Sequence, residues 1–329
     1  MTAHLQKRFP PVLGYCALVL LFALSVFLGL LLGDVQMEVG ELLDVLFAGP
    51  FKTVDEAFNQ SVVWRIRLPR VFATALSGAV LAAAGVAFQA VLRNPLAEPY
   101  TLGVASGAAF GAACAILTSM PWVTAASFAG GVGTLFIVWI LSERGNEPDV
   151  SRVILAGVIV GSVLGAGLTL MKALAGDQVS AIIVWLLGSF SAASWSDAMP
   201  LSLAFCIILL VCVSNYKEMD IMASGANASA LGLDIVRRRL FILAGASLAV
   251  SFVVSRFGII GFVGLVVPHL LRILFGPSHR TLIPLSLLGG AALLSVADTM
   301  AKMWNELPAG VLTVLIGGPV FCVILWNRR

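Results

Sequence analysis

The stretch VFATALSGAVLAAAGVAFQAVL, residues 71–92, decides the fold of this chain. It runs for 22 residues without a charge, and about 20 apolar residues suffice for a helix to cross the hydrocarbon core of a bilayer. Small residues recur at every fourth position, at Ala75, Ala79, Ala83 and Ala87. Such a row lets helix backbones approach each other closely in lipid. The stretch therefore predicts a transmembrane helix with one tightly packed face.

The composition of the whole chain agrees with this interpretation. Of its 329 residues, 60% are hydrophobic and 11% are charged, whereas about 25% are charged in a soluble domain. The five cysteines lie in apolar runs without a C-x-x-C pair, and the three histidines are scattered. The sequence thus predicts an all-α polytopic membrane bundle without a metal site, disulfide or cofactor. A water-soluble globule is excluded.

Ten apolar runs predict membrane spans. They are residues 11–33, 71–92, 101–120, 121–142, 153–171, 198–214, 240–255, 257–276, 281–297 and 308–327. A further run, 180–190, is too short to cross and suits an interfacial or re-entrant helix. Ten spans place both termini on one side, and a cytoplasmic side then holds thirteen of the 20 Lys and Arg residues. This bias follows the positive-inside rule, so we expect cytoplasmic termini.

The span interiors lack the groups that energy-coupled carriers use. Among ionisable residues only His269 and Arg272 fall inside a run, toward its cytoplasmic end. Proton- or sodium-driven carriers keep such groups at membrane depth. The chain also lacks the G-x-x-x-x-G-K-[ST] loop that binds ATP phosphates, and it has no catalytic constellation. The alternatives are a stand-alone channel or secondary carrier, and a permease energised by a partner.

Several segments resemble one family of permeases over nearly the whole chain. They are RIRLPR (65–70), RNPLAEPYTLGVASGA (93–108), GFVGLVVPHLLR (261–272), SHR (278–280), AD (297–298) and ELPAGVLTVLIGGPVF (306–321). Together they are similar to the FecCD family, the membrane subunits of ATP-driven importers for ferric siderophores, haem and cobalamin.

The resemblance implies a single permease domain, 1–329, with the type II ABC importer permease architecture, in the cell inner membrane. It implies a second permease subunit, usually an identical one, two ATPase subunits and an external substrate-binding protein. No nucleic acid and no bond chemistry by this chain are implied. The cargo implied is a ferric siderophore or haem, with cobalamin as the alternative. No residue separates these substrates.

Three basic residues are candidates for docking the binding protein. Arg67 and Arg70 lie at the external start of the second predicted span, and Lys302 lies near the end of the ninth. The resemblance implies that these positions meet acidic residues of the partner. Lysine lacks the planar fork of arginine, so its contact would be looser. The alternative is that the two arginines anchor the span at the interface.

Two further sets concern the translocation path and a turn. Ala79, Ala83, Ala87 and His269 are candidates for lining the path, because small side chains let a bulky cargo pass without holding it. Helix packing, or for His269 a structural role beside Pro268, is the alternative. In NPLAEP, the residues Asn94, Pro95, Glu98 and Pro99 predict a rigid turn between two spans.

The loop at about 215–239 is the candidate ATPase-coupling site. The glycines predict two short helices broken at Gly225, and the resemblance places coupling helices here. The candidate contact residues are Met219, Asp220, Met222, Gly225, Ala228, Leu231 and Gly232. Relatives usually carry a charged pair between the two glycines, where this chain reads ANASAL, so we expect docking by packing more than by ion pairs. Arg237, Arg238 and Arg239 then start the next span as membrane anchors.

Overall fold

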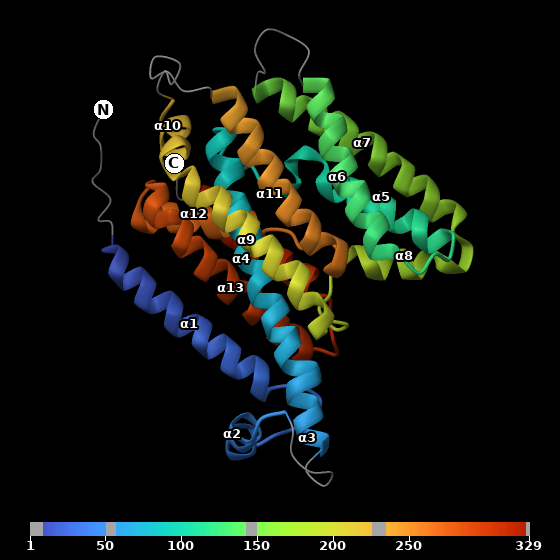
Figure 1. Ribbon diagram of the computed structural model, residues 1–329, viewed down its shortest axis with the longest axis vertical. Helices are drawn as coiled ribbons and strands as arrows, with labels where there is room; N and C mark the ends of the chain where they lie inside the picture. The colour runs from blue at the N-terminus through green and yellow to red at the C-terminus, as the bar shows by residue number, and fades with distance from the viewer. Residues whose placement is uncertain (1–8, 51–56, 143–149, 226–234, 327–329) are drawn as a thin grey trace.

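The long helices account for most of the chain. A computed structural model describes residues 9–50, 57–142, 150–225 and 235–326, and within them seven helices are long and apolar enough to cross a membrane. These are α1 (Pro11–Leu31), α4 (Leu68–Val91), α6 (Val123–Ser142), α7 (Val150–Leu174), α9 (Ala198–Ser214), α11 (Ile235–Phe257) and α13 (His279–Met303). Figure 1 shows them inclined in one common direction, as expected for a membrane bundle.

Four shorter apolar helices complete the bundle. They are α5 (Val104–Leu117), α8 (Val179–Leu186), α12 (Val263–Phe275) and α14 (Ala309–Trp326). Each of the ten predicted spans coincides with one helix, although α5 and α12 have only 14 and 13 residues. Ten is therefore an approximate count of spans. The run at 180–190 contains the eight-residue α8, which confirms that it is too short to cross.

The second span begins earlier than its apolar run indicates. A short helix, α3 (Ala57–Ser61), and a π-helical turn, Val62–Arg67, lead into α4 without a break, so that 58–91 form one stretch of 34 residues. The sequence prediction started this span at residue 71, because the arginines before it break the apolar pattern. Arg67 and Arg70 consequently lie within a continuous helix, and α2 (Val39–Ala48) lies beside its protruding end (Figure 1).

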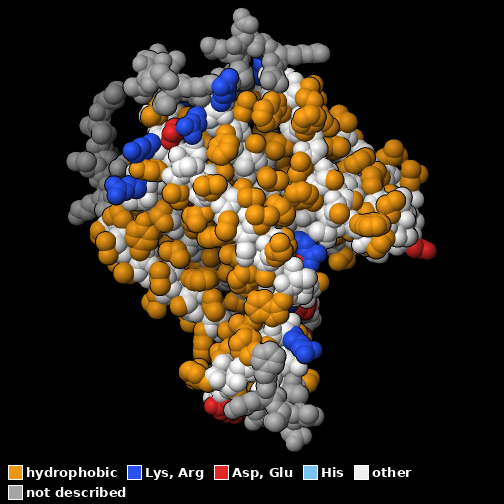
Figure 2. Space-filling view, in the orientation of Figure 1, with side chains coloured by type: hydrophobic (Ala, Val, Ile, Leu, Met, Phe, Trp, Pro, Cys, Tyr) orange, Lys and Arg blue, Asp and Glu red, His pale blue; other side chains and the backbone are white. Residues whose placement is uncertain are grey.

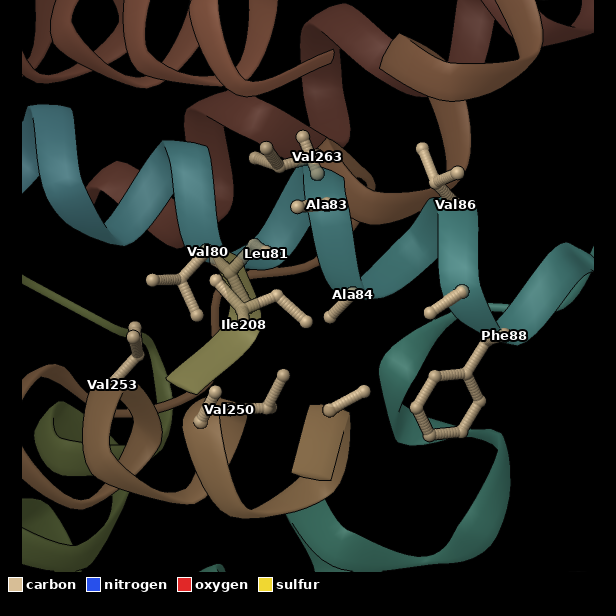
Figure 3. Close-up of a cluster of buried hydrophobic side chains, with 14 of the residues drawn as sticks. Val80, Leu81, Ala83, Ala84, Val86, Phe88, Ile208, Val250, Val253 and Val263 are labelled. Atoms are coloured by element: carbon tan, nitrogen blue, oxygen red, sulfur yellow. The ribbon is translucent and has the colours of Figure 1, made fainter. Parts of the chain in front are cut away.

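Helix α4 forms the centre of the molecule. Most of its apolar stretch is buried, whereas α1, α6 and α7 expose most of theirs. In Figure 3, side chains of α4 such as Val80 and Ala84 face Ile208 of α9 and the side of α11 that carries Val250. A Cβ atom at Gly78 would collide with the carbonyl of Gly290 in α13, so the backbones of these two helices touch. Close contact of this kind replaces the hydrophobic force that is absent in lipid.

The bundle has two distinct ends, and hydrogen bonds connect several helices at one of them. At one end the amide of Phe9, just before α1, donates to Leu274 at 3.1 Å, close to the end of α12. The start of α13 and α10 (Tyr216–Ser224) meet at the same end, where His279 and Asp220 are bonded. Figure 1 places α10 and α3 at opposite ends of the molecule. We call them the α10 end and the α3 end.

The surface is apolar between these ends. Figure 2 shows hydrophobic side chains over most of the visible face, as a chain surrounded by lipid requires. Lys217, Arg237, Arg238 and Arg280 are exposed, and all four belong to the helices or loops of the α10 end. The uneven distribution of exposed basic residues distinguishes the two ends.

Candidate functional site

Two of the predicted docking residues, Arg67 and Lys302, cap the end of α1. The Arg67 guanidinium donates through Nη1 to the carbonyls of Leu30 and Leu31 at 2.6 and 2.8 Å. The Lys302 ammonium donates to the carbonyl of Gly29 at 3.0 Å. The last carbonyls of a helix lack partners within it and carry partial negative charge, which cations at this position satisfy. These two side chains therefore bind α1 to α4 and α13.

The third docking candidate, Arg70, is bonded to two carboxylates. Its Nε and Nη2 donate to Asp298 at 2.9 and 3.0 Å, and its Nη1 and Nη2 donate to Glu306 at 2.8 and 2.7 Å. The side chain of Asp298 is 3% exposed and that of Glu306 is 38% exposed. The hydrogen bonds from Arg70 hold the pKa of the Glu306 carboxyl below its usual range. A buried guanidinium is tolerated here because a carboxylate is hydrogen-bonded along each of two of its edges.

The structure brings the three predicted docking residues together but corrects their expected exposure. Arg67, Arg70 and Lys302 are 4%, 5% and 6% exposed, whereas charges at the start or end of a span were expected to face water. They are buried because the helix of Arg67 and Arg70 starts well before them and the end of α1 lies against them. Sequence reasoning also missed two partners, Asp298 and Glu306. Both lie in the motifs AD and ELPAG, but without the fold nothing connected them to Arg70.

A cavity of about 120 Å³ lies beside this cluster. The segment 32–35 lines it together with Val62, Ile66, Arg67, Arg70, Lys302 and Glu306. Asp34, at its rim, is exposed. The lining therefore combines apolar side chains with the cationic and carboxylate groups of the cluster, so the cavity offers both kinds of contact at the α3 end.

Helix α10 is fixed to the bundle by both packing and hydrogen bonds. Its own residues Met219 and Met222 are buried against the rest of the bundle. The carboxylate of Asp220 accepts a hydrogen bond from the amide of His279 at 2.9 Å and lies 2.6 Å from its ring Nδ1. The side chain of Arg93, just after α4, donates to the carbonyl of Met222 at 2.8 Å. Helix α10 is thus bonded to the start of α13 and to the end of α4.

The end of α10 agrees with the prediction from sequence. Gly225 follows its last residue with φ +76°, the left-handed conformation in which glycine commonly ends a helix. The predicted break at Gly225 is confirmed. Ala228, Leu231 and Gly232, and with them the predicted second short helix, lie outside the described residues. Arg237, Arg238 and Arg239 lie in the first turns of α11, where the sequence placed them.

The candidate path residues lie inside the chain. Ala79, Ala83 and Ala87 are buried in the central helix α4, and His269 is buried with its ring edge-on to Phe321 at 5.5 Å. Their burial within the chain supports the alternative to a path wall, which is helix packing for the alanines and a structural role for His269. Spacing alone could not separate the two, because a row of small residues suits both a close contact and a smooth wall.

Helix α7 carries the small and polar residues that do face outward. Ser162 and Thr169 are exposed, and their hydroxyls donate to carbonyls one turn earlier in the same helix. Gly165 faces open space, whereas a Cβ at Gly157 would lie 2.8 Å from the backbone of Leu102. The glycines of this helix thus divide into a packed part and an open part.

The NPLAEP segment forms a hydrogen-bonded turn between α4 and α5. The side chain of Asn94 accepts from the amide of Leu96 at 2.9 Å, and Pro95 lies between them. Glu98 caps a 3-10 helix that starts at Pro99, and its own amide donates a hydrogen bond to Oγ1 of Thr101 at 3.0 Å. Burial raises the pKa of the Glu98 carboxyl. The segment is a rigid turn in this structure, and its prolines explain why α4 stops.

The described residues contain no group of three or more His, Cys, Asp or Glu side chains arranged to hold a metal ion. Charged contacts of the described residues instead gather at the α3 end, around Arg70, and at the α10 end, around Asp220.

Comparison with known proteins identifies the class of molecule. Residues 20–327 match the FecCD transport family. The chain is 36% identical to a cobalamin import permease of Halobacterium salinarum, over 87% of this chain and 79% of that one. It is 30% identical to a molybdate import permease of Haemophilus influenzae, with 95% of each covered. It is 34% identical to a hemin transport permease of Yersinia pestis, over 85% of this chain and 88% of that one.

A solved structure has the same fold. It is a metal-chelate type ABC transporter in an inward-facing conformation, and its chain superposes with a TM-score of 0.83 at 29% sequence identity. The superposition covers 97% of this chain and all of the other. The similarity therefore extends over nearly the whole chain.

Proposed function

The chain belongs to the FecCD transport family, and we propose that it passes a metal chelate, a ferric siderophore or haem, through the membrane into the cytoplasm. It is the permease subunit of an ABC importer, and ATP is hydrolysed by a separate subunit. The observation that carries the proposed cargo is the similarity to a metal-chelate type transporter over nearly the whole chain. The hemin relative from Yersinia pestis supports the same class.

Cobalamin is the second candidate cargo. The relative from Halobacterium salinarum imports cobalamin and is more similar in sequence than the hemin relative. The molybdate relative widens the range, since molybdate is a small oxyanion and not a chelate. All three names share a metal-containing solute. The proposal is therefore a metal complex first, with the type of complex to be determined by experiment.

The two ends of the bundle support opposite roles in an importer. The exposed basic residues at the α10 end support a cytoplasmic position for that end and for both termini. In this orientation α10 is the contact for the ATPase subunit, and the α3 end is the contact for an external binding protein. Movement of α10 then reaches α13 and α4 through Asp220 and Arg93. Alternating access between the two ends follows from such a movement.

The outward face of α7 supports a path between two permease subunits. Ser162 and Thr169 place hydroxyl groups on this exposed face, and the wall of a path for a polar cargo uses such groups. The open position of Gly165 leaves room for a bulky cargo on the same face. We therefore place the path wall on α7 and the second subunit, an identical chain, opposite to it.

Transport by reconstituted protein tests this function. The permease is placed in vesicles with its ATPase, and the binding protein is added outside with a ferric siderophore, haem or cobalamin. Each of these cargoes absorbs visible light at its own wavelengths, so the contents of washed vesicles identify the one transported. We expect uptake of one cargo that requires both ATP and the binding protein. Uptake without the ATPase would indicate a channel or secondary carrier instead.

A further inference from the structure

Glu306 covers the outward side of the Arg70 guanidinium. Asp298 binds the inward side and is buried, whereas the Glu306 side chain is 38% exposed. Each carboxylate makes two hydrogen bonds to the fork of the guanidinium, which is the strongest geometry for such a pair. A further carboxylate arriving from the α3 end can therefore reach Arg70 only at the position that Glu306 holds.

The two neighbouring cations are committed to other partners. In the described part of the chain, the hydrogen bonds of Arg67 and Lys302 go to backbone carbonyls at and just after the end of α1. Breaking them would leave buried carbonyls without partners. The pair of Arg70 and Glu306 differs, because an incoming carboxylate replaces one acceptor with another. This pair is therefore the exchangeable contact of the cluster.

The backbone at Glu306 is held in an unfavourable conformation. Asn305 and Glu306 have φ +52° and +57°, in the left-handed region that residues other than glycine seldom adopt. They lie in the short connection between α13 and α14, where the amide of Leu307 donates to Ala301 at 3.1 Å. Local strain of this kind persists only while surrounding contacts enforce it. The two hydrogen bonds to Arg70 are such contacts, so releasing Glu306 also releases the strain.

We propose that an acidic side chain of the docking protein takes the place of Glu306 on Arg70, and that docking thereby frees the connection 304–308 that leads into α14. The inference rests on the proposed function, in which the α3 end binds an external protein. It adds to that function a device by which the permease registers its partner. The partner chemistry it requires is a carboxylate on a protein surface that fits over the cavity beside Arg70.

Binding measurements on two matched variants test the exchange. The full-length permease in lipid nanodiscs is titrated with its substrate-binding protein, as wild type, as Glu306→Gln and as Asp34→Asn. Glu306→Gln removes the competing carboxylate, and we expect a Kd about fivefold lower, the gain typical of one half-exposed ion pair. Asp34→Asn removes the same charge from the rim of the same cavity without touching Arg70, so we expect less than about a twofold change from long-range charge.

Equal effects of the two variants, or weaker binding by Glu306→Gln, would overturn the exchange while leaving the importer function in place. Absence of binding by the wild type would instead overturn the docking on which both proposals rest. A second measurement uses the wild type alone, namely hydrogen–deuterium exchange of the peptide covering 304–308. Exchange of carboxylates predicts faster deuterium uptake at Leu307 when the partner binds. Slower uptake would mean that the partner only covers the loop.

Discussion

Replacing Arg67 with alanine separates a structural role from a docking role. In the structure its guanidinium bonds the carbonyls of Leu30 and Leu31 and also that of Val35. If this capping is its main role, Arg67→Ala destabilises the permease even when no partner is present. If docking is its main role, the isolated permease is unaffected and only the binding of the partner is lost.

The hydrogen bonds give the expected magnitude. A hydrogen bond from a charged donor contributes roughly 1.5–3 kcal/mol to stability. Removing the bonds to Leu30 and Leu31 should therefore lower the free energy of unfolding by about 3 kcal/mol. Water can reach the half-buried Leu31 end and recovers part of this loss, while the cation also stabilises the helix dipole by about 0.5 kcal/mol. We expect a loss of about 2–4 kcal/mol in the free energy of unfolding.

Thermal unfolding of the permease in detergent measures this loss. At one fixed scan rate, tryptophan fluorescence should report an apparent Tm about 5–10 °C lower for Arg67→Ala. Arg65→Ala is the matched control, because Arg65 is exposed two residues earlier and should change the stability by less than about 0.5 kcal/mol. Equal Tm values for the two variants would refute the capping argument and favour docking.

Three further predictions concern other parts of the bundle. Asp220→Ala should lower ATPase stimulation by the loaded binding protein about tenfold in vesicles, because α10 then loses its hydrogen bonds to His279 at the start of α13. Glu218→Ala on the same helix should not lower it, and equal stimulation by the two variants would contradict the coupling role. Gly78→Leu should lose the single symmetric peak of the folded protein in size-exclusion chromatography, since a side chain there collides with the backbone of α13. Gly133→Leu, whose side chain enters open space, should keep that peak. The pKa of Glu306 is lowered in the folded protein, so the ion pair stabilises the fold above the unfolded pKa, and this stabilisation is lost as pH falls through the folded pKa. The Tm difference between wild type and Glu306→Gln should therefore vanish on acidification. A Tm difference that stays constant with pH would contradict the ion pair.

Local features of the structure could be predicted from the sequence. Apolar runs predicted the eleven apolar helices of the described residues, ten of them as spans and α8 as a shorter helix, because burial in lipid depends on the composition of each segment alone. The end of α10 at Gly225 followed from the conformational freedom of glycine. The turn at Asn94 followed from its prolines. In each case the signal and its cause lie within a few residues of each other.

The candidate site depended on contacts that no local pattern contains. Arg67 and Lys302 were expected at the surface, and they are buried because the carbonyls of α1 lie against them. Asp298 is separated from Arg70 by more than two hundred residues, so its role was visible only in the fold. Ala83 shows the same limit, since its row of small residues suits a packed helix and a path wall equally well.

Helices α4 and α13 connect the two ends of the permease. Over its 25 residues α13 is about 37 Å long, and it carries His279 at the α10 end and Asp298 near the α3 end. The backbones of the two helices touch at Gly78 and Gly290, so neither can slide past the other without a clash. A displacement of α10 is therefore applied to both helices together and reaches Arg70, which joins them at the far end. In the proposed importer, the same rigid pair of helices therefore links the proposed ATPase contact at α10 with the proposed contact for the binding protein at the α3 end, and no flexible relay is needed.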